Sequence, residues 1–390
     1  MIAFAWLSML VLLTAVYALF TVRMRAGLRL LRADASVEHD TVPDEALPSL
    51  TVVVPMRNER GNIPRLLSSL RGQDYPVSRR EVLFVDDHSD DGGVELLETL
   101  VEHEHAERVL RMPAGRQGKK AAIAHAVAYA RGTVIVSTDA DCVHKAGWLR
   151  AMAQPFVHGA DVVAGPVVLD GEGGMFGRMQ ALEFLGLVGV GAGFFGIGYP
   201  RMCNGANLAY SVARFHEAGG YADNQDVHSG DDEFLLRTIV YRLGGAAHFV
   251  TDEPAIVRTA AQRGVFAFLR QRVRWVSKSR YNEDGRFVSF LVLLFAYFVG
   301  LLGLPVIAVT GSAAAALSLL LWVVKMVLDG LVLFPAARLF RQPIRLPDLL
   351  VAELLHPVYL VLVSLLGIRG SFAWKGRRLR NRRSRSAISG

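Results

Sequence analysis

The chain has 390 residues, of which 52% are hydrophobic and only 20% are charged. A wholly soluble protein usually carries more charge, so this balance indicates membrane segments beside one large or two modest domains. The net charge of +7 would suit nucleic acid, anionic lipid or a phosphate-bearing substrate, but the arginines gather beside apolar segments, which favours a membrane over nucleic acid. The two cysteines, Cys142 and Cys203, indicate neither a disulfide framework nor a thiolate metal cluster, and a reducing compartment is expected.

Residues 1–22 predict a transmembrane anchor. They carry no charge, and as a helix they would span about 33 Å, enough to cross a bilayer core. A secretory signal peptide is the alternative, but it would start with basic residues, whereas here the basic residues follow the apolar segment. By the positive-inside rule, the basic linker 23–49 and the catalytic domain after it would be cytoplasmic.

Short β-branched segments alternate with helical segments from residue 50 onward. The expected strands are 50–55, 82–85 and 133–137, and the expected helices are 62–72, 92–106 and 119–131. This alternation predicts an α/β domain with a mostly parallel sheet covered on both faces. Ligands bind such sheets at the carboxyl ends of the strands, and acidic residues follow two of these strands.

Further apolar segments follow in the C-terminal third. Residues 287–336 are long enough for a transmembrane hairpin, in which Lys325 and Asp329 could pair on one helix face. If 349–368 also crossed, the arginine-rich tail 369–390 would lie outside, against the positive-inside rule. We therefore expect 349–368 to be interfacial or re-entrant, with a third crossing as the alternative, and the tail to be cytoplasmic.

Two groups of acidic residues follow the strands. Asp86 and Asp87 end the second strand, where a carboxylate can accept a hydrogen bond from a uracil ring N–H or a ribose hydroxyl; a capped, solvated turn is an equally supported alternative. Asp139 and Asp141 could together hold a divalent cation that neutralises a diphosphate, with helix capping as the alternative. The helix start at Gly118-Lys119 strengthens the cation hypothesis.

Two later segments contain candidate catalytic and ligand-binding residues. The acidic run Asp231-Asp232-Glu233 opens an expected helix over 234–242; it could cap that helix, but three adjacent acids repel one another, which favours a catalytic base. Farther on, four residues share one helix face at spacings i, i+3, i+4 and i+7, and they suit a sugar beside a diphosphate. These residues are Gln271, Arg274, Trp275 and Lys278. An interfacial helix with its tryptophan at the headgroups is compatible with the same pattern.

Taken together, these segments resemble the family-two inverting glycosyltransferases, over about residues 48–285 and the flanking membrane segments. The resemblance rests on four features in order: the Val-Asp-Asp region, Thr-Asp-Ala-Asp, Gly-Asp-Asp and Gln-x-x-Arg-Trp. It implies a Rossmann-like nucleotide-diphospho-sugar transferase domain of GT-A type, with N-terminal and C-terminal transmembrane helices. It also implies transfer from a nucleotide sugar, with a UDP-sugar as the expected donor, and a divalent metal, Mg²⁺ or Mn²⁺.

The resemblance implies roles for individual residues. Asp232 would be the catalytic base, with Asp231 as the alternative because the family's usual Glu-Asp is Asp-Asp here; Asp139 and Asp141 would hold the metal. The implied donor-binding residues are Pro55, Arg57, Glu59, Asp86, Asp87, Lys119, Asp139, Gln271, Arg274 and Trp275. The implied acceptor-binding residues are Asn204, Gly205 and Asn207. His88 replaces the glycine of the family's Asp-Gly-Ser turn, which leaves the donor preference open.

The expected organisation follows from these assignments. In chain order it comprises a transmembrane anchor (1–22), a basic linker (23–49), a nucleotide-sugar-binding half (50–170), an acceptor-binding half (171–260), an interfacial Gln-x-x-Arg-Trp helix (261–286), a transmembrane hairpin (287–336), an interfacial, re-entrant or transmembrane segment (349–368) and a basic cytoplasmic tail (369–390). Residues 171–200 are glycine-rich without a clean period, so a loop-and-helix region near the membrane or the acceptor is expected there.

The functional hypothesis is therefore an integral protein of a bacterial-type inner membrane that moves a sugar from a nucleotide-sugar donor to a lipid acceptor. The C-terminal residues 372–377 are similar to the tails of members that glycosylate membrane lipids. A processive polysaccharide synthase of the same family, with a growing glycan as acceptor, is the first alternative. A nucleotidyltransferase would need neither an acceptor base nor membrane helices, and a membrane scaffold would have no use for the acidic residues together.

Overall fold

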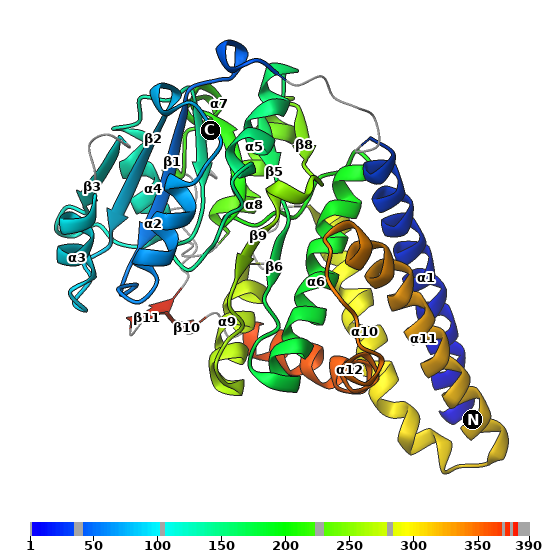
Figure 1. The fold of residues 1–390 in the computed structure, drawn as a ribbon. Helices are drawn as coiled ribbons and strands as arrows, with labels where there is room; N and C mark the ends of the chain where they lie inside the picture. Colours follow the sequence, from blue (N-terminus) through cyan, green and yellow to red (C-terminus); the bar gives the residue numbers. More distant parts are fainter. Residues whose placement is uncertain are drawn as a thin grey trace, which may run out of the picture.

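The chain forms an α/β domain on one side and a group of long apolar helices on the other (Figure 1). The structure, a computed structural model, describes residues 2–34, 42–101, 106–222, 230–278, 284–368, 371–374 and 377–380. Most of the tail 369–390, for which a cytoplasmic location was predicted, lies outside the described residues; a short antiparallel hairpin, β10 (Ser371–Trp374) and β11 (Arg377–Arg380), is the described part of it.

A seven-stranded sheet forms the centre of the α/β domain, with the order β3-β2-β1-β4-β7-β5-β8. Its strands are β1 (Leu50–Met56), β2 (Arg80–Asp86), β3 (Glu107–Arg111), β4 (Val134–Ser137), β5 (Val162–Ala164), β7 (Leu208–Ser211) and β8 (Ala247–Phe249). The predicted strands 50–55, 82–85 and 133–137 fall within β1, β2 and β4, which are parallel. A smaller parallel pair consists of β6 (Val167–Leu169) and β9 (Val257–Thr259).

The sheet is mixed rather than mostly parallel, because β7 runs antiparallel to both β4 and β5. The chain enters β7 from the edge where the parallel strands end: Leu208, the first residue of β7, pairs with Ser137, the last residue of β4. This register brings the loop before β7 to the same edge as the acidic residues that follow β4.

Shorter helices cover both faces of the sheet, since alternate strand residues point to opposite sides. Val52 and Val54 belong to one apolar cluster with Leu66, whereas Val53 belongs to another with Ile123. The helices are α2 (Ile63–Arg71), α3 (Gly93–Leu100), α4 (Lys119–Val127), α5 (Trp148–Val157), α7 (Val212–Glu217) and α8 (Asp231–Arg237), which continues as one π-helical turn (Thr238–Arg242). A further helix, α9 (Val265–Ser277), lies away from the sheet and packs against α12 (Leu346–Ile368) (Figure 1). Helix α3 is shorter than the predicted 92–106, and β3, which was not predicted, follows it.

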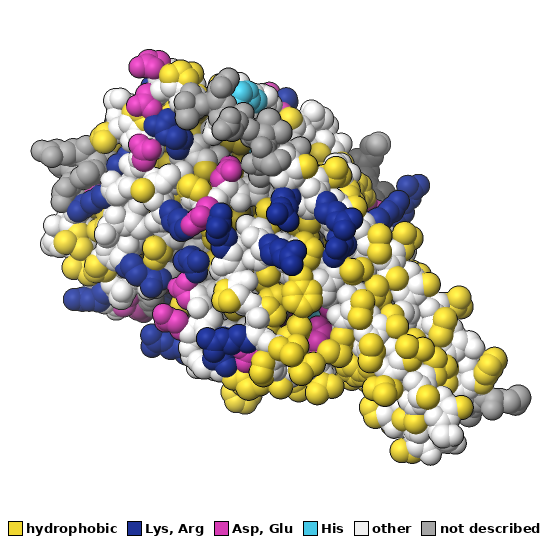
Figure 2. Space-filling view, turned by 45° about the vertical axis from the view of Figure 1, so that its right-hand side comes forward, with side chains coloured by type: hydrophobic (Ala, Val, Ile, Leu, Met, Phe, Trp, Pro, Cys, Tyr) yellow, Lys and Arg dark blue, Asp and Glu magenta, His cyan; other side chains and the backbone are white. Residues whose placement is uncertain are grey.

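Five helices are long and apolar enough to cross a membrane, judged by length and composition. They are α1 (Ile2–Asp34), α6 (Gly174–Gly196), α10 (Gly285–Ala308), α11 (Ser312–Leu339) and α12 (Leu346–Ile368). Figure 1 shows α1, α10 and α11 running side by side, while α12 lies across α6 and α10 toward α9. Apolar side chains cover this part of the surface, and Lys and Arg gather where it meets the α/β domain (Figure 2).

Helix α1 extends well past the predicted end at residue 22. The added turns are amphipathic: Met24, Leu28 and Leu31 are buried at helical spacing, while Arg25 is half-buried and Arg29 is exposed. The basic residues therefore form the outer face of the same helix.

Most of the glycine-rich segment 171–200, for which a loop-and-helix region was expected, forms one continuous 23-residue helix, α6. Its glycines allow close contact with α1. A Cβ added to Gly27 of α1 would lie 2.0 Å from the Gly193 carbonyl oxygen, and one added to Gly196 would lie 2.1 Å from the Gly27 oxygen. The two helices thus touch backbone to backbone, which only residues without a side chain permit.

We expect Gly27→Ala to lower the free energy of unfolding by about 1–3 kcal/mol, the usual cost of overpacking, because the two backbones must separate. Thermal or denaturant unfolding in detergent measures this. Gly186→Ala, also in α6, is the matched control: its Cβ would lie 3.5 Å from a Leu333 methyl, an ordinary contact, so stability should stay level or rise. Equal behaviour of both variants would contradict the close α1–α6 contact.

Candidate active site

The carboxyl ends of β1, β2 and β4 open onto one cavity of about 1980 Å³. Most of the site residues predicted from the sequence line it: Pro55, Arg57, Glu59, Asp87, Lys119, Asp139, Asp141, Asn204, Gly205, Asp232, Gln271, Arg274 and Trp275. These residues come from segments more than 200 positions apart in the chain, and the fold gathers them at one edge of the sheet.

Three of the predicted site residues are not among the described side chains that line the cavity. Asp86 is buried and accepts a hydrogen bond from the Ser89 N–H at 3.1 Å, so it has the turn-capping geometry weighed from the sequence. Asn207 is fully buried behind the cavity wall, where its amide bonds to Trp148 and to the carbonyls of Pro166 and Ala255. Asp231 opens α8, but its side chain lies outside the described part of the structure.

The loops after β1 and β2 are tied together at one end of the cavity. The Arg57 guanidinium donates to the carbonyls of Asp87 and His88, at 2.6 and 2.9 Å. The Asp87 carboxylate accepts from the Gly118 N–H at 2.9 Å, immediately before α4. Gly118 has φ +94°, which side-chain-bearing residues rarely adopt, so glycine is needed to turn the chain into α4 here.

Asp139 and Asp141 lie beside the start of α4. The Lys119 ammonium approaches Asp139 Oδ1 at 2.7 Å, which places a cation against the carboxylate pair. No group of three or more His, Cys, Asp or Glu side chains among the described residues could hold a metal. Two carboxylates still fit Mg²⁺ or Mn²⁺, because such ions are often bound through one or two carboxylates with substrate phosphates and water completing the shell.

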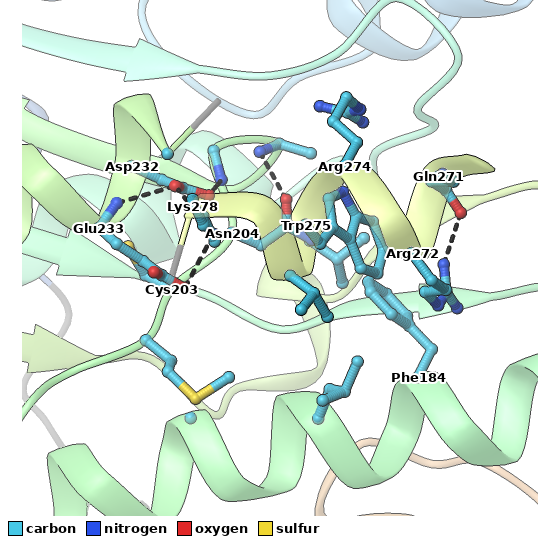
Figure 3. A pocket seen from close by; sticks show the side chains of 18 of the residues that line it. Phe184, Cys203, Asn204, Asp232, Glu233, Gln271, Arg272, Arg274, Trp275 and Lys278 are labelled. Carbon is cyan, nitrogen blue, oxygen red and sulfur yellow. Dashed lines mark hydrogen bonds and ion pairs between the residues drawn. The ribbon is translucent and has the colours of Figure 1, made fainter. Parts of the chain in front are cut away.

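Asp232 is held by groups from three segments (Figure 3). Its oxygens accept from the N–H groups of Gly205 and Glu233, at 3.0 and 2.8 Å. The ammonium of Lys278, which directly follows α9, lies 3.7 Å from Asp232 and 2.9 Å from Glu233. This arrangement joins α8, the end of α9 and the loop before β7 around one carboxylate.

The surroundings shift the pKa values of Asp232 and Glu233 in opposite directions. Burial works to raise the pKa of Asp232, but Lys278, Lys119 and the two backbone N–H groups outweigh it and hold the pKa below the usual value. Burial raises the pKa of Glu233, and the Asp232 charge adds to that effect, although Lys278 opposes it. Asp232 is therefore the acid more readily ionised, as a base must be before it accepts a proton.

Helix α9 contributes a second buried ion pair, which the sequence did not predict. Arg272, 2% exposed, pairs with Glu183 of α6 at 2.5 Å, and its guanidinium lies 4.2 Å from the Trp275 ring centroid. Tyr359 of α12 also donates to Glu183, at 2.8 Å. Arg272 thus fixes the Gln-x-x-Arg-Trp helix to two apolar helices. The sequence did contain a hint of this ion pair, because Glu183 is an isolated acidic residue within the apolar segment 174–196.

Arg201 is another residue that the sequence did not single out. It pairs with Asp284, the residue that caps α10, and its guanidinium stacks on Tyr199 and Tyr241 at 4.1 and 4.8 Å. This contact ties the loop before β7, which carries Asn204 and Gly205, to the first turn of α10.

The same cavity continues away from these charges into apolar surroundings. Phe290 and Leu294 of α10, Leu187 of α6 and Val363 of α12 line that end. One continuous space therefore connects carboxylates and ammonium groups at the strand ends with apolar side chains of three long helices.

Two family models match the chain. "Glycosyl transferase family 2" matches residues 51–199, and "Glycosyl transferase family group 2" matches residues 134–365, more than half of the chain.

Relatives share segments of the chain. The glycosyltransferase AglE of Haloferax volcanii is 33% identical over 132 residues, which cover 31% of this chain and 40% of that protein. The beta-monoglucosyldiacylglycerol synthase of Synechocystis is 34% identical over 113 residues, 29% of this chain and 22% of that protein. The matches therefore span less than half the length of these relatives.

A solved structure matches nearly the whole chain. The mannosyltransferase PcManGT of Pyrobaculum calidifontis, in complex with GDP-Man and Mn²⁺, has a TM-score of 0.52 at 18% identity, over 93% of this chain and 96% of that one. At this identity the likeness concerns the fold alone, and it confirms the predicted GT-A type domain with flanking apolar helices.

We expect Arg272→Met to cost about 3–5 kcal/mol of stability, because it leaves the Glu183 charge enclosed without its cation. The double variant Arg272→Met/Glu183→Gln should regain most of this loss, and denaturant unfolding of the set measures it. Arg270→Met, an exposed position on the same helix, is the control and should change little. If the double variant lost as much as the single one, the ion pair would not explain the stability of α9.

Proposed function

The chain belongs to glycosyl transferase family 2, as its motifs predicted, and on this premise we propose that it transfers a sugar from a nucleotide sugar to a lipid acceptor. One observation carries the proposal: a single cavity is lined by charged residues at the strand ends and by apolar residues of α6, α10 and α12. A water-soluble donor and a lipid can meet in such a space, each in surroundings that suit it.

The donor belongs at the strand ends under this proposal. Asp87 would accept from the nucleoside, while Arg57 holds the two flanking loops in place. Asp139 and Asp141 would hold the divalent cation, Mg²⁺ or Mn²⁺, which when bound would offset the charge of the departing nucleoside diphosphate. A UDP-sugar remains the expected donor, and Lys119 adds a fixed cation beside the carboxylates.

The acceptor hydroxyl would lie near Asp232. Because Lys278 and two backbone N–H groups hold Asp232 as a carboxylate, it can take the proton of that hydroxyl as the oxygen attacks the anomeric carbon. Attack from the face opposite the diphosphate would invert that carbon. Trp275, held by Arg272, would form the wall beside the sugar.

A lipid acceptor has independent support. The name of one relative states that it makes a glucosylated diacylglycerol, although the match spans only 22% of that protein. We place the α/β domain in the cytoplasm, since α1 ends in the arginines 23, 25, 29 and 32, and α11 returns to a loop with Arg341 and Arg345. Helices α1, α10 and α11 would then cross a bacterial-type inner membrane, and α12 would lie across α10 and α6.

In the direct test, membranes that contain the protein are incubated with each of a panel of labelled nucleotide sugars, with and without divalent metal. The lipid phase is then extracted and its label measured. We expect label in a lipid of single size; a ladder of products would instead favour the processive synthase. Asp232→Asn should reduce transfer by about 10²–10⁴-fold, the usual contribution of a general base, while donor binding persists.

The matched control for this test is Asp252→Asn, the same change at an exposed carboxylate outside the cavity lining, which should keep full transfer. Undiminished transfer by Asp232→Asn would remove Asp232 from the role of base. Absence of label from the lipid phase with every donor would refute the proposed function itself.

The pH dependence of transfer should follow the charge of Lys278. This cation helps to keep the pKa of Asp232 low, so Lys278→Met should raise that pKa. The base must be ionised to act, so a higher pKa means that the variant loses activity earlier as the pH is lowered. We therefore expect the acid limb of the pH profile of kcat/KM to shift to higher pH. Lys145→Met, which removes a surface ion pair with Glu253, should leave the limb in place. An unmoved limb in Lys278→Met would argue against this coupling.

A further inference from the structure

Helix α12 presents two different faces. Its outward face is apolar and exposed, consistent with contact to lipid: Leu350, Leu354, Val358, Leu362 and Leu365. Its opposite face lines the cavity and includes polar side chains among the apolar ones: Glu353, His356, Tyr359 and Ser364. Glu353, His356 and Tyr359 follow one another at intervals of three residues, so they form one stripe along the helix.

Part of this stripe belongs to a group of ionisable side chains from three helices, which we call the bundle cluster: Tyr17, Lys325, Asp329, Glu353 and His356. The Lys325 ammonium is completely buried; it lies 2.9 Å from Asp329, as predicted for this pair, and also pairs with Glu353. Tyr17 donates to Asp329 at 2.5 Å, and His356 Nδ1 lies 3.8 Å from the same carboxylate.

The bundle cluster contains two carboxyl groups, which lie within hydrogen-bonding reach of each other, and one ammonium group. Within the described residues, two carboxylates face the single Lys325 ammonium, and both carboxylates and His356 also line the cavity. Charged groups in such apolar surroundings are costly, and they usually mark a substrate or ion pathway.

The position of the cluster along α12 shows what it can reach. Near its C-terminal end, α12 packs Gly367 against Val276 and Ser277 of α9, next to Lys278, which holds Asp232. At 1.5 Å per residue, His356 and Glu353 lie about 16 and 21 Å back along the helix from Gly367. The acceptor hydroxyl at Asp232 is therefore too far away to contact the cluster, but the body of a lipid extending along the cavity would pass it.

We propose that the bundle cluster binds a second polar group, a hydroxyl or amine, on the body of a neutral lipid acceptor. This inference rests on the proposed function and specifies its acceptor class. Carboxyl oxygens accept hydrogen bonds, so they favour a ligand group that donates one over a phosphate. A plain hydrocarbon chain would shield these polar groups from water without replacing their hydrogen bonds, and a site of that kind discriminates against a ligand that lacks the group.

Binding of two matched probes to the full-length protein in lipid nanodiscs tests the proposal. The probes are octadecanol and the same alcohol with a second, mid-chain hydroxyl, and saturable protection against thermal unfolding is the readout. We expect the diol to bind about tenfold more tightly, the factor that one hydrogen bond to a charged group provides. His356→Phe, which keeps a ring, and Glu353→Gln, which keeps the shape, should each bring the ratio toward one without weakening octadecanol.

Leu354→Ala, on the outward face of α12, is the control and should retain the tenfold ratio. A ratio near one in the unmodified protein, a ratio that both cluster variants leave unchanged, or no saturable binding of either probe would overturn the inference. The proposed function is judged separately by label in the lipid phase: transfer without diol preference would refute only the subsite, whereas diol preference without transfer would refute only the proposed transfer to a lipid.

Discussion

The arrangement of the cavity depends on the neutralisation of buried carboxylates by cations from other segments. An enclosed charge without a partner is costly, so each pair fixes the two segments that supply it. Four pairs between segments surround the cavity, the first of them partly exposed and the others enclosed: Lys119 with Asp139, Lys278 with Asp232, Arg272 with Glu183, and Lys325 with Glu353. Together they connect the strand ends to α4, α8 to the end of α9, α9 to α6, and α11 to α12, so charged residues around the candidate site also hold its walls in place.

Helix α6 determines how closely the apolar helices can approach this site. Its contact with α1 is made by backbone atoms at Gly27, Gly193 and Gly196. The same helix carries Glu183, the partner of Arg272, so its position sets the position of α9 and of Trp275. A bulkier α1–α6 contact would therefore displace a wall of the cavity, although the contact itself lies far from Asp232 in the sequence.

Structural features that local sequence patterns encode could be predicted, whereas features that depend on residues distant in the chain could not. The strands before Asp86 and Asp139 were predictable because a buried strand leaves a β-branched run, and the order of four motifs was sufficient for the family and the GT-A fold. The antiparallel direction of β7 has no local signal, since it depends on where the chain re-enters the sheet. Glycines that permit helix contact look the same in sequence as glycines that break a helix, so α6 was expected to be partly irregular.

The same distinction applies to single residues of the candidate site. Asn204 and Asn207 are three positions apart, yet one lines the cavity and the other is hydrogen-bonded behind its wall, because the chain turns into β7 between them. Arg272 lies at a variable position of Gln-x-x-Arg-Trp, and its importance follows from Glu183, 89 residues earlier. Since α9 contacts α6 through this pair and α12 through Val276, a lipid that moves either helix would also move Trp275. Under the proposed function, occupation of the apolar end of the cavity would thereby affect how firmly the sugar is held at the charged end.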